Sequence, residues 1–289
     1  MEIKCRDFYV KKITVFRFLF FCKCEFVRFS SSIKFCRTIV KCLLEIIGKW
    51  IIMKNPLTAL ITGSGHRLGS SMALFLSEQG YNLVIHYNTS KKEAENLAHI
   101  IEKNGRHAYC IKVDLAKTPE KLIPLARRTV GNIDLLVNNA SIFPEGSIKS
   151  FSATEIINVL KINSLAPLLL GQTYVKSQVQ GNIINITDGN ACNFNERYQI
   201  YRISKILLET ITIEQACLYA PHFRVNAIAP GIIIPAVGEK QTETLLLKTP
   251  LQKKGSMADI NSALWYLINS DYVTGQIMYI DGGLHMGKV

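Results

Sequence analysis

Short apolar runs alternate with amphipathic stretches along the chain from residue 57 onward. The first run, 57–62, has the length and the continuous apolar character of a central strand in a parallel sheet. Further strands are predicted at 82–87, 108–113, 133–137, 183–187, 224–229 and 276–280. Helices are predicted at 70–78, 90–103, 119–129, 201–219 and 257–268. Repeated β–α units of this kind predict an α/β fold, a single doubly wound, Rossmann-type parallel sheet with helices on both faces.

Residues 1–53 do not follow this pattern and form a basic, aromatic-rich extension. They hold eleven Lys and Arg against four Asp and Glu, so +7 of the formal net charge of +12 lies in them. No repeat, low-complexity tract or linker interrupts the pattern after residue 56, so we predict that 54–289 form one domain. Because most of the basic charge lies outside that domain, it gives no argument for nucleic-acid binding there.

Several interpretations of the extension compete. Arg17 inside the apolar stretch and the lack of a small-residue cleavage site disfavour a secretory signal. A spanning helix needs roughly 20 apolar residues, and neither 13–22 nor 38–52 provides them without a charge. A membrane-surface helix over 38–52 stays open. We expect that translation starts at Met53, so that the extension before this methionine is not translated, or that residues 1–53 are disordered, and we expect no firm membrane association.

The cysteines of the main domain are few and scattered. Cys110, Cys192 and Cys217 are typical of reduced thiols rather than of a disulfide framework. In the extension, Cys22 and Cys24 are too close for a zinc site, and no pair of histidines follows them. The sequence therefore predicts a cytoplasmic protein without a metal site.

A glycine-rich loop follows the first strand and opens the first helix. It reads Gly-Ser-Gly-His-Arg-Leu-Gly at 63–69. Glycine lets the backbone approach a pyrophosphate, and the N-terminus of the following helix offers free N–H groups and a partial positive charge. Between a strand and a helix, this motif predicts a dinucleotide site. Its candidate cofactor-binding residues are Gly63, Gly65, His66, Arg67, Leu68 and Gly69.

The ends of the next three strands carry further candidates for the cofactor site. The second strand ends in His-Tyr-Asn-Thr-Ser at 86–90, without an acid to accept the ribose 2′-hydroxyl of NAD. With Arg67 in the first loop, the site should accept a 2′-phosphate, which predicts NADPH as the cofactor. Asp114 can meet the adenine amino group, or it only caps the next helix. The candidates here are His86, Tyr87, Asn88, Ser90, Asp114, Leu115, Asn139, Ala140 and Ser141.

Tyr201 and Lys205 lie four residues apart on a predicted helix, and Asp188 precedes the tyrosine by thirteen residues. Positions i and i+4 share one face of a helix. A nearby positive charge lowers the pKa of a phenol from about 10, so Tyr201 is a candidate proton donor near neutral pH. The spacing alone is weak, because such pairs also occur by chance on surface helices.

The motifs of the main domain form a recurring set. They are T-G-x-x-x-R-x-G at 62–69, N-N-A-S at 138–141, Asn163, Tyr201 with Lys205, N-A-I-A-P-G at 226–231 and D-G-G at 281–283. Together they resemble the short-chain dehydrogenase/reductase superfamily over about residues 57–285. Most members have serine where this chain has Asp188 and glycine where it has Arg67. Both departures resemble the pteridine reductase branch, which includes the dihydromonapterin reductases.

Asp188 can be interpreted physically. A serine hydroxyl donates a hydrogen bond to the oxygen of a ketone under reduction, whereas an ionised carboxylate only accepts and would repel the developing alkoxide. Asp188 therefore fits a substrate that presents N–H donors or needs a proton at a ring nitrogen, and a pterin is such a substrate. Alternatively, Asp188 only orders its loop.

The resemblance implies roles for individual residues. Tyr201 would pass a proton to the pterin, alone or with Asp188, and Lys205 would hold the nicotinamide ribose and lower the pKa of Tyr201. Asn163 would keep a water in the proton relay. Phe143 would stack on the pterin opposite the nicotinamide, or else pack under its loop. The implied sets are Asp188, Tyr201, Lys205 and Asn163 for catalysis, Ser141, Phe143, Asp188 and Tyr201 for the substrate, and Lys205, Pro230 and Gly231 for the cofactor.

The leading hypothesis is an NADPH-dependent reductase that transfers hydride to a C=N bond of a dihydropterin, with dihydrofolate as a further candidate. The alternatives are a short-chain carbonyl or 3-oxoacyl-thioester reductase and a non-catalytic NADPH-binding regulator, against which the Tyr201–Lys205 pair argues. Thr89 stands where relatives often have a basic residue, so the 2′-phosphate site is expected to rest on Arg67, His86 and Ser90. The loop at 232–255 has no clear match, and the resemblance implies a homotetramer.

Overall fold

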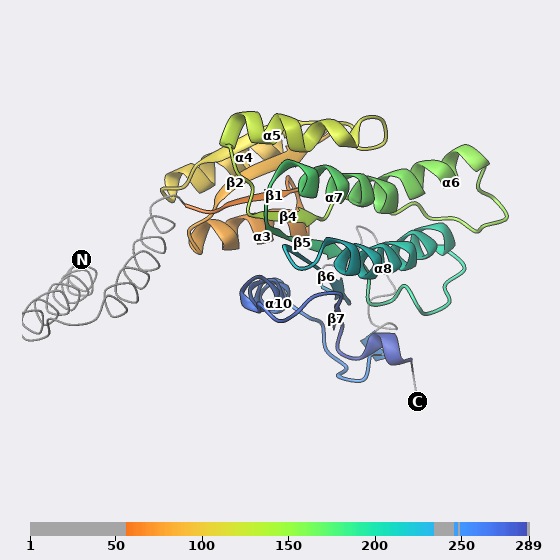
Figure 1. Cartoon of the computed structure of the whole chain (residues 1–289). Coiled ribbons are helices and arrows are strands. Elements are labelled where there is room, and N and C mark those ends of the chain that lie inside the picture. The colour runs from red at the N-terminus through yellow and green to blue at the C-terminus, as the bar shows by residue number, and fades with distance from the viewer. Residues whose placement is uncertain (1–55, 234–245, 248, 288–289) are drawn as a thin grey trace, which may run out of the picture. The chain divides into compact units, whose positions relative to one another are not determined.

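The structure is a computed structural model of the chain, and it describes residues 56–233, 246–247 and 249–287 (Figure 1). The chain divides into two units, Met1–Asn55 and Pro56–Val289, of which the second is described below. The extension 1–53, with its expected start at Met53, lies outside the described residues. Residues 234–245 and 248 of the loop at 232–255 lie outside them as well.

Seven parallel strands form one sheet in the order β3-β2-β1-β4-β5-β6-β7, which confirms the predicted doubly wound fold. They are β1 (Thr58–Ile61), β2 (Asn82–Tyr87), β3 (Ala108–Lys112), β4 (Leu135–Asn138), β5 (Gly181–Ile186), β6 (Phe223–Pro230) and β7 (Ile277–Ile280). β1 pairs with β2 on one side and with β4 on the other. The strand order therefore reverses between β1 and β4, and their carboxyl ends are where such sheets bind ligands.

Helices cover both faces of the sheet (Figure 1). They are α3 (Arg67–Glu78), α4 (Lys91–Lys103), η1 (Pro119–Lys121), α5 (Leu122–Val130), α6 (Ala153–Leu160), η2 (Lys161–Leu165), α7 (Ala166–Ser177), α8 (Gln199–Tyr219), α10 (Met257–Asn269) and η3 (Leu284–Met286). One apolar core joins the sheet to α3, α4 and α10, and the other joins it to α5, α7 and α8. Because both faces are buried, β1 and β4 are apolar along nearly their whole length, as the pattern predicted.

α3 and α5 differ most from the predicted helix starts, and α8 begins two residues early, at Gln199. α3 starts at Arg67, within the glycine-rich loop, and not at residue 70, because His66 is already extended and its carbonyl accepts a hydrogen bond from the Ser70 N–H. The predicted helix at 119–129 opens with the 3₁₀ turn η1, which has Pro119 as its first residue. The earlier start of α3 matters for function, since it brings the helix N-terminus to the end of β1.

The stretch Ala153–Ser177, which comprises α6, η2 and α7, is the one described helix that is long and apolar enough to cross a membrane. Its residues Ala166, Leu170 and Tyr174 are buried in the core beside β4 and β5. Packing on the sheet accounts for this part of its apolar composition. The π-helical turn η2 in its middle turns Asn163 inward, where the side chain is fully buried.

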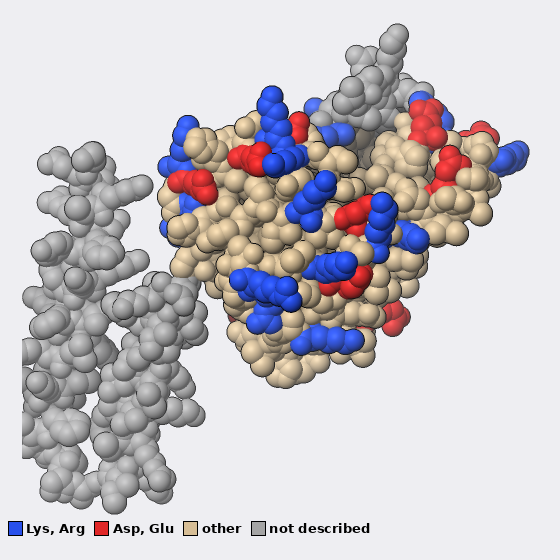
Figure 2. All heavy atoms as spheres, turned by 90° about the horizontal axis from the view of Figure 1, so that it is seen from above, with Lys and Arg blue, Asp and Glu red and all other residues tan. Residues whose placement is uncertain are grey.

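Charged side chains are mixed in sign on the face shown in Figure 2, where blue basic and red acidic groups are interspersed. The net charge of residues 54–289 is +5, since +7 of the total lies before them. The charge that matters for chemistry is the small set of ionisable groups inside the cavity described next.

Candidate active site

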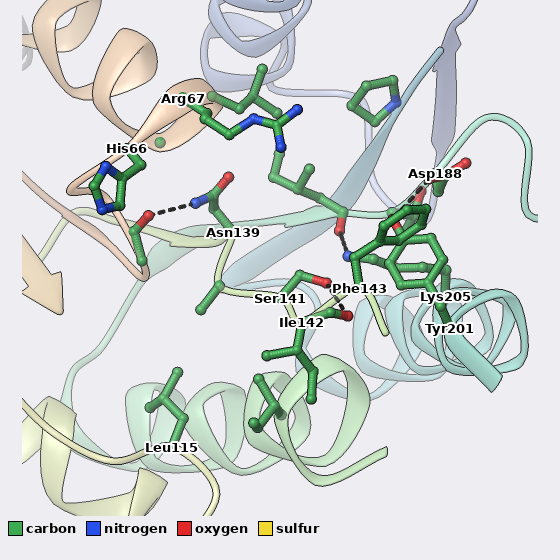
Figure 3. A pocket seen from close by; sticks show the side chains of 18 of the residues that line it. His66, Arg67, Leu115, Asn139, Ser141, Ile142, Phe143, Asp188, Tyr201 and Lys205 are labelled. Carbon is green, nitrogen blue, oxygen red and sulfur yellow. Dashed lines mark hydrogen bonds between the residues drawn. The ribbon is translucent and has the colours of Figure 1, made fainter. Parts of the chain in front are cut away.

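A cavity of about 620 Å³ opens at the carboxyl ends of the central strands. It is lined by all but one of the residues predicted for the site, from the glycine-rich loop to the helix that carries Tyr201 (Figure 3). The predicted residues in its wall are Gly63, Gly65, His66, Arg67, Leu68, Gly69, His86, Tyr87, Asn88, Ser90, Asp114, Leu115, Asn139, Ala140, Ser141, Phe143, Asp188, Tyr201, Lys205, Pro230 and Gly231. Segments far apart in the sequence therefore meet at one place.

Tyr201 and Asp188 form a hydrogen-bonded pair at the end of β5. The Tyr201 hydroxyl donates to Asp188 Oδ2 at 2.8 Å, and the Asn190 N–H donates to the other carboxylate oxygen at 2.7 Å. Lys205 is buried one helical turn after Tyr201, where its ammonium donates to the Ile186 carbonyl at 2.8 Å. Its Nζ lies 5.7 Å from the centre of the Tyr201 ring. These groups share one small space, so the protonation of each affects the others.

The pKa of Tyr201 is raised well above its usual value of 10, whereas the sequence predicted that Lys205 would lower it. Burial of the phenol is the main cause, and the negative charge of Asp188 and the hydrogen bond to it act in the same direction. The positive charge of Arg67 opposes them. The predicted lowering of the Tyr201 pKa is not found, because burial of the phenol and the nearby carboxylate of Asp188 outweigh the effect of positive charge.

Burial also shifts the pKa values of Asp188 and Lys205, the two charged neighbours of Tyr201. It raises the pKa of Asp188, although hydrogen bonds from Tyr201 and Asn190 and the charge of Lys205 counteract it. It lowers the pKa of Lys205 to about 8, while Asp188 pulls in the opposite direction. The Asp188 carboxylate and the Lys205 ammonium are each costly to bury without the opposite charge of the other. The raised pKa values of Asp188 and Tyr201 both favour keeping a proton on this pair.

Asn163 is the predicted site residue that does not line the cavity. Its amide nitrogen donates to the Ile142 carbonyl at 2.9 Å and to Ser204 Oγ at 3.0 Å, and its amide oxygen accepts from the Ile142 N–H at 2.9 Å. The expectation that Asn163 keeps a water in a proton relay stays a prediction. The contacts of its side chain hold the loop after β4, which carries Ser141 and Phe143, to η2 and α8.

The glycine-rich loop packs closely against the end of β4. A Cβ atom at Gly69 would lie 2.6 Å from Asn139 Nδ2 and 2.8 Å from the Gly63 carbonyl oxygen, closer than real contacts allow. The same Asn139 amide donates to the carbonyls of Thr62 and Gly63 at 2.9 and 3.1 Å. Asn139 therefore holds the loop directly, and glycine at residue 69 is required by this packing.

His86 is a buried support for that loop. Its Nδ1 accepts a hydrogen bond from the Gly63 N–H at 3.1 Å, and its Nε2 donates to the Val113 carbonyl at 3.0 Å, which fixes the tautomer. Burial lowers the pKa of His86 to about 4, so the ring is neutral at pH 7. This corrects the expectation that the 2′-phosphate site would rest partly on His86. Both ring nitrogens are occupied by hydrogen bonds to the backbone, at Gly63 and Val113.

Arg67 has a left-handed backbone conformation, and its side chain points into the cavity. Its φ is +50°, in the left-handed region that favours the glycine found there in most relatives. Its side chain extends from the glycine-rich loop into the cavity (Figure 3), and its charge lowers the pKa of Tyr201. The expected role of Arg67 at the 2′-phosphate stays a prediction.

Phe143 lies beside Tyr201 and stacks on the ring of Tyr198. Tyr198 was not predicted from the sequence. Phe143 stacks on Tyr198 with ring centres 4.2 Å apart, and it meets the Tyr201 ring edge-on at 4.4 Å. Phe143 is 46% exposed, so part of it faces the cavity. Tyr198 precedes Tyr201 by three residues, a spacing that places both side chains near one another at the start of α8.

The loops that carry Phe143 and Tyr198 are joined to one another. Glu145 accepts a hydrogen bond from Arg197 Nε at 2.7 Å, and the Gly146 N–H donates to the Arg197 carbonyl at 2.6 Å. Gln199 Oε1 accepts a hydrogen bond from the Ile148 N–H at 2.7 Å.

The cavity is also lined by residues that were not predicted from the sequence. They are Thr89, Ala116, Ile142, Ile162, Ile186, Thr187, Asn190, Asn195, Tyr198, Arg202, Ile232, Ile233 and Leu284.

Comparisons with known proteins agree with this architecture. A family model described as enoyl-(acyl carrier protein) reductase matches residues 63–285. The 3-oxoacyl-(acyl-carrier-protein) reductase FabG of Staphylococcus epidermidis is 29% identical over 247 residues, which cover 79% of this chain and 99% of that protein. An uncharacterised oxidoreductase of Thermotoga maritima is 30% identical over 78% of this chain and 95% of that protein.

A solved structure points to a different activity within the same fold. It is FolM alternative dihydrofolate reductase 1 from Brucella canis, complexed with NADP. It has 30% sequence identity and a TM-score of 0.75, and the match covers 80% of this chain and 94% of that one. A blue fluorescent protein from a metagenomic library, in complex with NADPH, has 27% identity and the same TM-score over 80% of this chain and 98% of that one.

Proposed function

The chain belongs to the short-chain dehydrogenase/reductase superfamily, and from this premise we propose that it is an NADPH-dependent reductase of dihydropterins. NADPH, when bound, supplies a hydride for the C=N bond of the pterin. The observation that carries the proposal is the 2.8 Å hydrogen bond from Tyr201 to Asp188, in place of the tyrosine–serine arrangement of ketone reductases.

Several features of the cavity support the binding of a dinucleotide with its pyrophosphate at the glycine-rich loop. Gly63 and Gly69 let the glycine-rich loop pack closely against Ala140 and Asn139. The N-terminus of α3 lines the cavity, where its free N–H groups and partial positive charge would bind a pyrophosphate. No Asp or Glu stands at 86–90, after β2, where an acid would favour the unphosphorylated ribose of NAD. Lys205, buried near Tyr201, is placed to bind the nicotinamide ribose. These features support NADPH, as do the cofactors of the two solved relatives.

The Asp188–Tyr201 pair is suited to a nitrogen heterocycle. Because burial and Asp188 keep the proton on Tyr201, the phenol can donate it to a ring nitrogen, and Asp188 takes part in that transfer. The carboxylate can also accept hydrogen bonds from the amino and ring N–H groups of a pterin. A ketone would instead place a developing alkoxide beside a negative charge, which costs free energy.

The aromatic side chains beside this pair suit a flat substrate. Phe143 presents a partly exposed ring whose position is set by stacking on Tyr198. A pterin held between Phe143 and the nicotinamide would gain stacking on one face and stand within reach of Tyr201 and Asp188. Ser141, on the same loop, is placed to contact the cofactor or the pterin.

A second candidate is a 3-oxoacyl-thioester reductase. It is favoured by the 29% identity to FabG, which is about the same as the 30% identity to FolM. It is disfavoured by Asp188, for the electrostatic reason above. The two activities need different substrates and are easily separated.

The test is a substrate panel in which NADPH oxidation is followed by absorbance. We expect turnover with dihydromonapterin, dihydrobiopterin or dihydrofolate, with NADPH preferred over NADH, and little turnover with a 3-oxoacyl thioester. Faster reduction of the thioester than of every pterin would overturn the proposal in favour of the second candidate. No turnover with either class, despite NADPH binding, would favour a regulator instead.

We also propose that residues 54–289 are the catalytic domain of a cytoplasmic homotetramer. The free thiols Cys110, Cys192 and Cys217 are compatible with a reducing compartment.

Exposed apolar side chains on α6, η2, α7 and α8 are candidates for the subunit contacts of the tetramer. They are 38–50% exposed and comprise Ile157, Leu165, Leu169, Ile203, Ile206 and Ile213. Light scattering after gel filtration gives the assembly directly, and a monomer would contradict this expectation.

A further inference from the structure

Arg202 is a cation in the cavity wall that the proposed chemistry does not use. It follows Tyr201 on α8, is half-buried, and lines the same cavity as Asp188 and Phe143. Its Nε donates to the Ala191 carbonyl at 3.0 Å, and its guanidinium carbon lies 5.9 Å from the centre of the Phe194 ring. A backbone acceptor and an aromatic face therefore hold the planar fork in place.

The two terminal nitrogens of Arg202 make no hydrogen bond to any described residue. No described carboxylate forms an ion pair with this guanidinium either. Burial lowers the pKa of Arg202, and the charges of Cys192 and Asp188 act in the opposite direction without contact. A cation that is partly desolvated and oriented, but not neutralised by a neighbour, has free energy to gain from an anion.

Arg197, five residues earlier, shows the contrast. It also stands near the cavity, but its Nε is paired with Glu145 at 2.7 Å, in a contact between two exposed side chains. Arg197 thus has its own carboxylate and joins two loops, whereas the terminal nitrogens of Arg202 have no such partner among residues 56–233, 246–247 and 249–287. Phe194, beneath Arg202, is 78% exposed, so the guanidinium lies against a ring at the protein surface.

We propose that Arg202 binds an acidic group on the side chain of the substrate, so that the preferred dihydropterin carries a carboxylate or a phosphate there. This inference rests on the proposed function. Arg202 lines the same cavity as Tyr201, and its guanidinium lies over the exposed ring of Phe194. The side chain of a pterin held beside Tyr201 would meet this guanidinium if it follows this part of the wall. Two parallel N–H groups of the guanidinium match the oxygens of a carboxylate or a phosphate.

The experiment compares three substrates that share one dihydropterin ring. Dihydromonapterin has a neutral side chain, dihydrofolate ends in carboxylates, and dihydroneopterin phosphate carries a phosphate. The measured quantity is the ratio of kcat/KM for each acidic substrate to kcat/KM for the neutral one. The variants are Arg202→Gln and, as a matched control that loses the same charge on the exposed face of α5, Arg128→Gln.

We expect Arg202→Gln to lower that ratio about tenfold or more for at least one acidic substrate, mainly through KM. Arg128→Gln should leave the ratio as in the native enzyme, and the substrate with the larger loss identifies the anion. If Arg202→Gln folds poorly, Arg202→Lys serves instead and should lower the ratio by a smaller factor, because it keeps the charge but loses the fork.

Two results would overturn the inference while the proposed function stands. In one, pterins are reduced but the ratio does not change in Arg202→Gln. In the other, all three substrates lose activity equally and the pH profile shifts, which would mean that Arg202 acts through Asp188. A native enzyme that reduces no pterin overturns the proposed function itself, and this inference with it.

Discussion

The two ends of the cavity are built in different ways. The cofactor end, at the glycine-rich loop, depends on backbone shape: Gly69 has no room for a Cβ, and neutral His86 and Asn139 hold the loop by hydrogen bonds to its main chain. The proposed substrate end depends on side chains: Phe143 and Tyr198 provide aromatic surface, and Tyr201 with Asp188 forms the hydrogen-bonded pair to which we assign proton donation. Changes at the first end should act on cofactor binding and stability, and changes at the second on turnover and choice of substrate.

Tyr201→Phe should have the largest effect and breaks the substrate end alone. Loss of the proton donor should reduce kcat about 10³-fold, while NADPH binding, measured by fluorescence titration, should stay close to the native value. The ring is kept, so its edge-on contact with Phe143 is preserved. Native-like turnover in this variant would refute the proton-donor role.

Asp188→Ser tests what the acid contributes to substrate choice. It restores the residue of most superfamily members and removes the charge that raises the pKa of Tyr201. We expect kcat/KM for a dihydropterin to fall about 10²-fold, and that for a 3-oxoacyl thioester to rise relative to it. Asp188→Asn, which keeps the shape, should lose pterin turnover without that gain. Unchanged preference in the serine variant would show that Asp188 only orders its loop.

The pH dependence tests the cation beneath the pair. Lys205 has a pKa of about 8, below the ordinary value for lysine, because of burial. It is charged below that pH and neutral above it, so binding of the ribose and turnover should decline as pH rises through 8. At pH 9, kcat/KM should be about tenfold lower than at pH 7. Tyr201 cannot produce this decline, because its pKa is raised well above 10. A flat profile from pH 7 to 9 would contradict the assignment.

Gly69→Ala breaks the cofactor end. The new methyl group would collide with Asn139 and the Gly63 carbonyl, so the unfolding free energy should fall by about 1–3 kcal/mol. The KM for NADPH should rise several-fold, with little change in the ratio between pterin substrates. Gly65→Ala is the control for stability, since its Cβ would lie at an ordinary 3.4 Å from Ser90 Cβ. Equal thermal stability of the two variants would contradict the packing argument.

Arg67→Gly should have the smallest effect and connects the two ends. Glycine relieves the left-handed backbone, so the unfolding free energy should rise by up to about 1 kcal/mol. Loss of the charge should raise the KM for NADPH several-fold and lower kcat modestly, because Arg67 also acts on Tyr201. Chemical denaturation measures the gain in unfolding free energy, and steady-state kinetics measure the changes in KM and kcat. A more stable variant with unchanged kinetics would show that Arg67 takes no part in cofactor binding or turnover.

The strands and the glycine-rich loop were readable from the sequence because their signals are local. β2 was predicted with its observed bounds, 82–87, and the loop at 63–69 lies where its motif indicated. The buried strands need continuous apolar runs, and the loop needs small residues, so both leave a pattern within a few positions. The Tyr201–Lys205 pair was readable for the same reason, since one helical turn separates them.

The interactions within the site depend on the tertiary structure. The raised pKa of Tyr201, the neutral state of His86 and the fastening role of Asn163 all depend on burial and on partners 13 to 41 residues away. Tyr198 and Arg202 stand next to predicted residues but were missed, because only the folded loops show what they face. The sequence by itself determined the fold, the glycine-rich loop and the spacing of Tyr201 and Lys205 on one helix. Only the tertiary structure decided which groups are charged and which are tied to the backbone, since desolvation and hydrogen bonding arise when distant segments meet.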